Sequence, residues 1–120
     1  MGVTMQIPRE AVLLRIFIGE DDKAGRQPLY EAIVLKAREM HLAGATVLRG
    51  PIGFGRSSRL HTTKILSLSE DLPIIIEIVD AEDKIGAFLP QLEMLMGSGS
   101  GLVTLEKVKV VRYGNGEPAP

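Results

Sequence analysis

The most uneven distribution of charge in the 120-residue chain lies between residues 41 and 69, where no acidic residue occurs. The basic side chains of this stretch alternate with glycine and serine, and they are Arg49, Arg56, Arg59, Lys64 and the ionisable His61. Arginine offers paired N–H donors to phosphate and carboxylate oxygens, and glycine leaves backbone amides open to the same oxygens. The pattern therefore predicts a site for a small anionic ligand at Gly53, Gly55, Arg56 and Arg59. A solvated loop whose charges only maintain solubility explains the same residues, and both interpretations stay open.

A glycine-serine turn at residues 97–101 is a second candidate cradle for an oxyanion. Its glycines are Gly97, Gly99 and Gly101. Glycine lets backbone amides approach an anion closely. The turn does not match the phosphate-binding pattern GxxxxGK[ST], and it precedes a predicted strand rather than a helix. A flexible connector remains the alternative interpretation.

Residues for catalysis are scarce. The chain contains no cysteine and only two histidines, which excludes thiolate zinc sites, iron-sulfur clusters and cysteine nucleophiles. No GxSxG nucleophile motif occurs. The acidic pairs at 21–22 and 82–83 fall in loop or helix-start contexts, where solvation favours a role as caps and surface groups. We therefore expect no enzymatic turnover and no metal site.

The length and composition limit the remaining classes of protein. A length of 120 residues predicts one domain. The formal net charge of -1 argues against nucleic-acid binding. The longest apolar runs fall far short of the roughly 20 residues that span a bilayer, so membrane insertion is not expected. The first residues lack a basic region followed by an apolar core, and the chain lacks cysteine, so we expect a cytoplasmic protein.

Hydrophobic periodicity predicts the elements that must position these residues. Period-two or β-branched patterns predict strands, and three- and four-residue spacing predicts helices. The expected elements are a strand at 11–18, a helix at 28–42, strands at 45–49 and 73–79, a helix from about 81 to 96 and a last strand at 102–113. Asp80 is the expected N-cap of the second helix, and Gly44 is expected to cap the C-terminal end of the first helix. Pro90 predicts a kink in the second helix.

This order predicts an α+β protein of the ferredoxin-like βαββαβ class, an antiparallel sheet with two helices on one face. Residues 62–69 can add an extra strand. The domain is expected at 10–113, with a mobile loop at about 50–62, between an N-terminal tail at 1–9 and a C-terminal tail at 114–120.

The first strand is apolar on both faces, whereas two helices can cover only one face of the sheet. Soluble monomers rarely expose a large contiguous apolar patch. A second copy of the chain is the simplest cover, and tolerated surface residues of a small monomer are the alternative.

Several segments resemble a known family. Residues 47–50, 53–56 and 61–62 are similar to the loop entry of nitrogen-regulatory PII signalling proteins, which carry a similar GFGR and HT pair. A closer resemblance is to the PII-like family catalogued as domain of unknown function 190. Its characteristic stretches are similar to residues 18–20, 28–34, 37–50, 53–62, 68–80 and 101–106 of this chain.

The resemblance implies a homotrimer whose sheets face a common core, with ATP, ADP or AMP as a regulatory ligand in clefts between subunits. It also implies that loop 50–62 contacts a partner protein, such as a membrane transporter. The ligand-binding residues that it implies are Gly53, Gly55, Arg56, Gly97, Gly99, Gly101 and Arg112. The chain departs from PII proteins at Leu102, where they place a lysine, and at Tyr113-Gly114, where a second arginine is expected. The modified tyrosine of the PII loop is absent too, so uridylylation is not expected.

Two alternatives from other classes remain. One is a small hydrolase acting on an acyl phosphate or a similar anion, because ferredoxin-like folds also carry such chemistry. The chain lacks the arginine-bearing glycine loop that this activity needs after the first strand. The other is a trimeric metal-binding protein in which copies of His61 converge.

Overall fold

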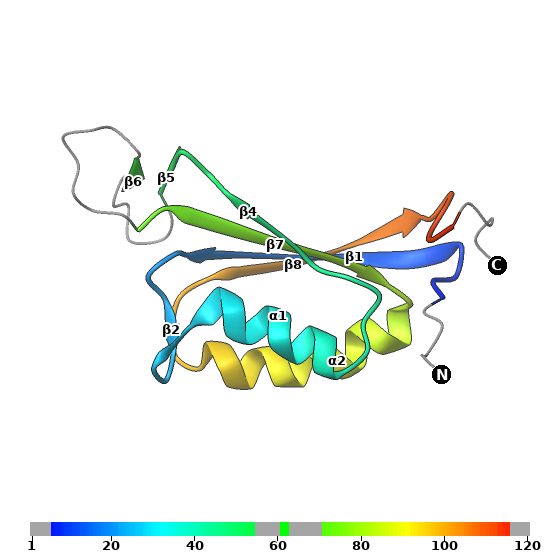
Figure 1. Ribbon diagram of the computed structural model, residues 1–120, viewed down its shortest axis with the longest axis horizontal. Helices are drawn as coiled ribbons and strands as arrows, with labels where there is room; N and C mark the ends of the chain where they lie inside the picture. Colours follow the sequence, from blue (N-terminus) through cyan, green and yellow to red (C-terminus); the bar gives the residue numbers. More distant parts are fainter. Residues whose placement is uncertain (1–5, 55–60, 63–70, 116–120) are drawn as a thin grey trace.

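A four-stranded antiparallel sheet with two helices against one face forms the centre of the molecule (Figure 1). The computed structural model describes residues 6–54, 61–62 and 71–115. In chain order the elements are β1 (Glu10–Gly19), β2 (Lys23–Ala24), β3 (Gln27–Pro28), α1 (Leu29–Glu39), β4 (Thr46–Arg49), β5 (Ile52–Gly53), β6 (His61–Thr62), β7 (Pro73–Asp80), α2 (Glu82–Met96) and β8 (Leu102–Lys109). The strand order in the main sheet is β4-β7-β1-β8. This is the predicted ferredoxin-like α+β architecture, with both helices on one face.

The core lies between the sheet and the two helices. Along β1 the residues Leu14 and Ile16 are fully buried, and their strand partners Ile76 and Ile78 on β7 are buried with them. Phe88 of α2 fills the space between the layers and has no exposed surface. Each such side chain contributes about 1.5–3 kcal/mol through removal of its apolar surface from water. The alternation of β1 and β7 therefore fixes which face of the sheet receives the helices.

The first helix is shorter than its pattern predicted. Pro28 precedes α1, where its missing N–H leaves no helical hydrogen bond unmade. The helix ends at Glu39 instead of residue 42, because His41 adopts a φ of 60° and turns the chain out of the helical path. Gly44, the predicted cap, has no positive φ and lies beyond that turn.

The second helix begins and ends close to its predicted limits. Ala81 is its N-cap residue and makes no side-chain cap hydrogen bond, so the prediction of Asp80 as N-cap was wrong. At the other end Gly97, with a φ of 56°, donates its N–H to the carbonyl oxygen of Glu93 at 3.0 Å. Pro90 lies inside the helix, and the kink expected there stays a prediction.

A backbone hydrogen bond joins the segment before β1 to the segment after β8. β8 ends at Lys109, earlier than the predicted residue 113, and the N–H of Val110 then donates to the carbonyl oxygen of Arg9 at 2.8 Å. Ile7 is only 4% exposed. The boundary at residue 10 stays a prediction, and the segment just before it already contributes a buried side chain.

A short hairpin marks the base of the predicted loop. Ile52 pairs with Thr62 and Gly53 pairs with His61, which joins β5 to β6. Residues 55–60 and 63–70 lie outside the described residues, and with them the middle of the loop and all of the possible extra strand at 62–69 except residue 62. The described part of the loop therefore consists of its two ends, held together as an antiparallel pair.

Candidate functional site

A cavity of about 690 Å³ lies at the end of the sheet from which the loop leaves. Its walls come from the end of β1, the base of the loop, the start of β7 and the glycine-serine turn before β8. The lining residues are 17–19, 52–54, 73–75 and 99–102, together with Asp22 and Asp71. Two regions that the sequence singled out independently, the loop base and the glycine turn, therefore share one cavity.

Glycine suits these walls because the chain segments approach closely, most of all at Gly53 beside the rigid ring of Pro73. A Cβ atom at Gly53 would lie 2.8 Å from Cγ of Pro73, and one at Gly101 would lie 3.2 Å from the carbonyl oxygen of Phe17 and 2.5 Å from the end of Met96. Real Cβ atoms essentially never approach other atoms below 3.0 Å. The absence of side chains at these positions holds the loop base on β7 and the turn on β1.

The turn presents fewer open amides than its glycine content suggests. The N–H groups of Gly97 and Gly99 already donate to the carbonyl oxygens of Glu93 and Met96, each at 3.0 Å. Ser100 and Gly101 line the cavity, and within the described part of the chain their amides donate to no carbonyl oxygen. An anion at this wall would therefore meet the amides of residues 100 and 101 rather than those of the whole turn.

Another part of the cavity lining is acidic, which the sequence pattern did not indicate. Asp22, interpreted from the sequence as a surface residue, accepts a hydrogen bond from the N–H of Gly19 at 2.9 Å. Asp71 accepts one from the N–H of Asp21 at 2.8 Å. Both carboxylates are held by backbone amides at the cavity, so one wall suits hydrogen-bond donors of a ligand while the glycine turn suits an anion. Only the fold brings residues 22 and 71 together, and no local pattern indicates it.

Charge at the entrance to the loop is partly neutralised. Arg49 of β4 forms an ion pair with Glu20, whose side chain is only 17% exposed. The Glu20 backbone N–H also donates to the carbonyl oxygen of Leu72 at 2.8 Å, which fixes this residue beside β7. The basic character inferred for residues 41–69 is therefore reduced at Arg49 by a carboxylate from outside that stretch.

The predicted binding residues separate into three groups. Gly53, Gly99 and Gly101 line the cavity, whereas Gly97 ends α2 and lies outside the lining. Arg112 lies at the opposite end of the sheet. The remaining predicted residues, Gly55, Arg56 and Arg59, lie outside the described residues.

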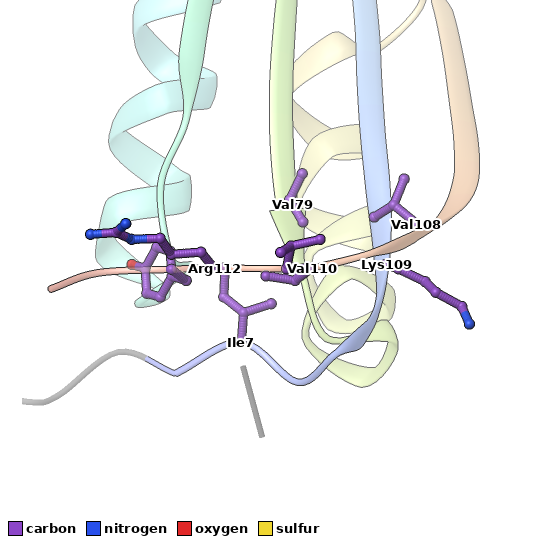
Figure 2. Close-up of a pocket in the computed structure, with 8 residues that line it drawn as sticks. Ile7, Val79, Val108, Lys109, Val110 and Arg112 are labelled. Carbon is purple, nitrogen blue, oxygen red and sulfur yellow. The ribbon is translucent and has the colours of Figure 1, made fainter. Parts of the chain in front are cut away.

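Arg112 borders a second cavity, of about 540 Å³, at the end of the sheet where β7 and β8 end (Figure 2). Apolar side chains make up most of its lining, including Ile7, Val79 and Val110. Figure 2 shows the segment of Val110 and Arg112 running across the ends of the strands, with the guanidinium beyond the sheet. Within one chain, Arg112 therefore cannot share a ligand with the glycine turn.

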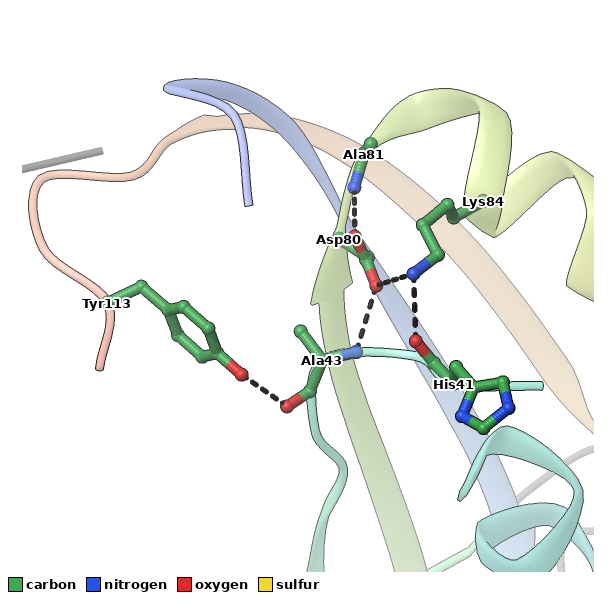
Figure 3. Close-up of polar contacts among 6 residues, drawn as sticks. All are labelled: His41, Ala43, Asp80, Ala81, Lys84 and Tyr113. Atoms are coloured by element: carbon green, nitrogen blue, oxygen red, sulfur yellow. Dashed lines mark hydrogen bonds and ion pairs between the residues drawn. The ribbon is translucent and has the colours of Figure 1, made fainter. Parts of the chain in front are cut away.

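A polar cluster fixes this terminal segment (Figure 3). Asp80 is fully buried, and its carboxylate accepts hydrogen bonds from the N–H groups of Ala81 at 2.7 Å and Ala43 at 2.9 Å. The hydroxyl of Tyr113 donates to the carbonyl oxygen of Ala43 at 2.7 Å. Lys84 completes the cluster, with Nζ 3.9 Å from the Asp80 carboxylate. The cluster joins the end of β7, the turn after α1 and the segment that carries Arg112.

The described residues contain no group of three or more His, Cys, Asp or Glu side chains that could hold a metal ion. In the same part of the chain, no helix has the length and apolarity needed to cross a bilayer. The backbone of His61 lies opposite Gly53 at the loop base.

Comparison with known proteins adds independent findings. The profile of the family DUF190, described as Uncharacterized ACR, COG1993, matches residues 11–110. A UPF0166 protein of Aquifex aeolicus is 39% identical over 99 residues, which cover 82% of this chain and 91% of the relative. A UPF0166 protein of Methanocaldococcus jannaschii is 34% identical over 96 residues, covering 79% and 88% of the two chains.

Among solved structures, the chain is similar to CPII of Thiomonas intermedia, a nitrogen regulatory PII-like protein bound to ADP, AMP and bicarbonate. The TM-score is 0.64 at 19% identity, with 86% of this chain and 90% of that chain covered. At this level of identity, the likeness establishes the fold.

Proposed function

The chain belongs to the DUF190 family and has the PII-like fold, and from this premise we propose that it is a regulatory protein that binds a small anionic ligand, with an adenine nucleotide as the leading candidate. The observation that carries the proposal is the cavity shared by the loop base and the glycine turn. A ligand in it would touch residues 52–54 at the base of the loop, and two of these, Ile52 and Gly53, pair with Thr62 and His61 at its other end. Binding can therefore alter the loop, which is the property a sensor needs.

The two walls of the cavity match the two parts of a nucleotide. The amides of Ser100 and Gly101 suit a phosphate group, while the carboxylates of Asp22 and Asp71 suit ribose hydroxyls or an amino group. The reverse orientation would place phosphate against carboxylate, which charge repulsion disfavours. CPII, a protein of the same fold, was solved with ADP and AMP, and this supports the choice of adenine nucleotides.

We propose a homotrimer in which copies cover the face of the sheet that the helices leave open. This arrangement explains how Arg112 could act on a ligand although it lies far from the glycine turn of its own chain. In a closed ring, the terminal end of one copy can lie beside the cavity of the next. Arg56 and Arg59 of the loop would supply the remaining positive charge.

Signalling would then depend on the loop. Phosphate pairing with Arg56 would favour one arrangement of loop 50–62, and a partner protein would recognise that arrangement. The proposed partner is a membrane transporter or another protein. We propose a cytoplasmic location for the chain itself. No turnover is proposed, because the sequence offers no arrangement of nucleophile and base.

Calorimetric titration with ATP, ADP, AMP and cyclic nucleotides tests this function, with the oligomer mass measured in parallel. Saturable binding at about one ligand per subunit is expected. Arg112→Ala and Arg56→Ala should each weaken binding about tenfold or more, in the range of a lost charge-assisted contact.

Arg38→Ala on the exposed side of α1 is the matched control and should bind as the wild type does. Failure of all the nucleotides to bind a well-formed oligomer would contradict the proposed ligand. Equal affinities of the Arg112→Ala and Arg38→Ala chains would remove Arg112 from the site.

A further inference from the structure

A band of charge crosses the open face of the sheet, which is the face of β4, β7, β1 and β8 turned away from α1 and α2. Arg15 of β1 lies directly opposite Glu77 of β7 in the strand register, and its Nε is 2.8 Å from Oε2 of that residue. Its Nη1 lies 3.3 Å from Oε1 of Glu106 on β8. These three side chains, the charged row, span three of the four strands of the sheet.

Apolar side chains flank the charged row along the strands. On the side of the cavity, Phe17 is paired with Ile75 and Leu102, and Leu48 of β4 is paired with Ile75. Leu48 and Leu102 are 46% and 56% exposed. Toward the termini, Leu13 lies opposite Val79 of β7, and on its other side it lies opposite Glu106 of β8, so the charged row runs diagonally between β1 and β8. The open face therefore alternates from apolar to charged to apolar, and its apolar parts favour contact with another surface.

The charged row is complementary to itself. A guanidinium offers five N–H donors on three nitrogen atoms, and the contacts found within the chain use two of these atoms. The side chain of Glu106 is 62% exposed, and only its Oε1 contacts Arg15. Each chain thus has donor capacity at Arg15 and acceptor capacity at Glu106 that a second copy of the same row can satisfy. This charge complementarity selects another copy as the occupant of the face.

We infer that the charged row sets the register between copies of the chain, with Arg15 of one copy paired to Glu106 of the next. The inference rests on the self-association in the proposed function and names the residues that make it specific. Apolar surfaces attract one another in many relative positions, whereas a charge that is covered without a partner is strongly unfavourable. Arg15 and Glu106 are paired within the chain, and a register that brings the rows together also gives the third guanidinium nitrogen and the second carboxylate oxygen of Glu106 a charged partner when water is excluded.

The state of Arg15 within one chain agrees with this role. Its hydrogen bond to Glu77 raises the pKa of the guanidinium above the ordinary value, with the charges of Glu77 and Glu106 adding to the effect and burial opposing it. Arg15 is therefore positively charged on the open face of the single chain.

Reversal of charge at the two positions tests the inference. Chains carrying Arg15→Glu or Glu106→Arg are purified separately, and their masses are measured by native mass spectrometry and sedimentation velocity, with circular dichroism as the test of folding. Each variant is expected to be folded and mainly monomeric, whereas the wild type forms one oligomer. The double variant Arg15→Glu/Glu106→Arg has opposite charges at these two positions in every copy, so opposite charges meet at every contact of a closed ring of three, and it should regain the wild-type mass.

Lys36→Glu and Glu39→Lys are the matched controls, because they reverse the charges of an ion pair of 2.9 Å on α1, away from the open face. Both should keep the wild-type mass. The inference is overturned if either single variant of the charged row keeps that mass, or if the folded double variant stays monomeric. Should Arg15→Glu fail to fold, the exposed Glu106→Arg decides alone: dissociation supports the inference and an unchanged mass overturns it. A monomeric wild type contradicts the self-association itself, independently of the calorimetry.

Discussion

Asp80 shows how one buried carboxylate can connect distant parts of a small domain. It has no exposed surface, and it accepts hydrogen bonds from the N–H groups of Ala81 and Ala43. A buried carboxylate is stable only when such partners replace the lost water. Because Tyr113 binds the same residue, Ala43, Asp80 also influences where the terminal segment lies.

We predict that Asp80→Asn lowers the free energy of unfolding by about 1–3 kcal/mol, because an amide NH₂ replaces one acceptor oxygen and then faces an N–H donor. Urea unfolding followed by circular dichroism, at one fixed protein concentration, measures the change. Asp83→Asn, at an exposed position in the first turn of α2, should cost no more than about 0.3–1 kcal/mol. Equal losses for the two variants would show that Asp80 is not the structural link described.

At the candidate site, individual residues differ in how far the sequence could indicate their place beside the cavity. Gly53, Gly99 and Gly101 stand in glycine-rich segments and were predicted, since glycine marks close approach or unusual backbone. Asp22 and Asp71 were missed, because an acidic residue in a loop is most often solvated, and 49 positions separate them. Arg112 was predicted from the family resemblance, and its place at the far end of the sheet became visible only in the fold.

The limits of α1 and α2 depend on contacts with other parts of the chain. Apolar spacing located both of them, whereas their ends depended on contacts that the spacing does not contain. His41 ends the connection after α1 with a positive φ, and its carbonyl oxygen accepts a hydrogen bond from Lys84 at 2.8 Å. A partner from α2 therefore stabilises a turn that the local sequence alone would place nearer Gly44.

Gly86 in α2 offers a test of helix stability apart from packing. A Cβ atom there would meet nothing within 4 Å, so Gly86→Ala should raise the free energy of unfolding by about 0.5–1 kcal/mol through a lower entropy of the unfolded chain. The midpoint of urea unfolding reports the change.

Gly25→Ala is the control, since it also meets nothing within 4 Å but has a φ of +63°. It should lower stability by about 1–2 kcal/mol. A gain at both positions would mean that the backbone conformation of residue 25 imposes no cost.

At the scale of the whole molecule, the two faces of the sheet have different functions. One face forms the core with α1 and α2, and the other keeps apolar side chains such as Leu48 and Phe17 without cover from the described part of the chain. The cavity and Arg112 lie at opposite ends of the sheet, so a complete site as proposed requires more than one copy. The uncovered apolar face is a reason for assembly that does not depend on ligand binding.

Leu48→Lys should weaken self-association at least tenfold, because it places a charge among apolar side chains of the open face. Sedimentation velocity over a range of concentrations measures the shift. Leu35→Lys on α1 is the matched control, with the same substitution at a leucine that is 52% exposed, compared with 46% for Leu48. Dissociation of the Leu35→Lys chain to the same extent would place the interface elsewhere.

The sequence by itself determined the class of fold, the order of its elements, the two-sided apolar character of the first strand and the family, because periodicity and motifs are local properties of the chain. Tertiary structure alone decided which residues share a cavity, where each helix ends and that Arg15, Glu77 and Glu106 form one row. These features depend on strand register and on contacts between residues far apart in the sequence. A register shift of one residue would move the charged row to the helix-facing side, so its position follows from the packing of the whole sheet.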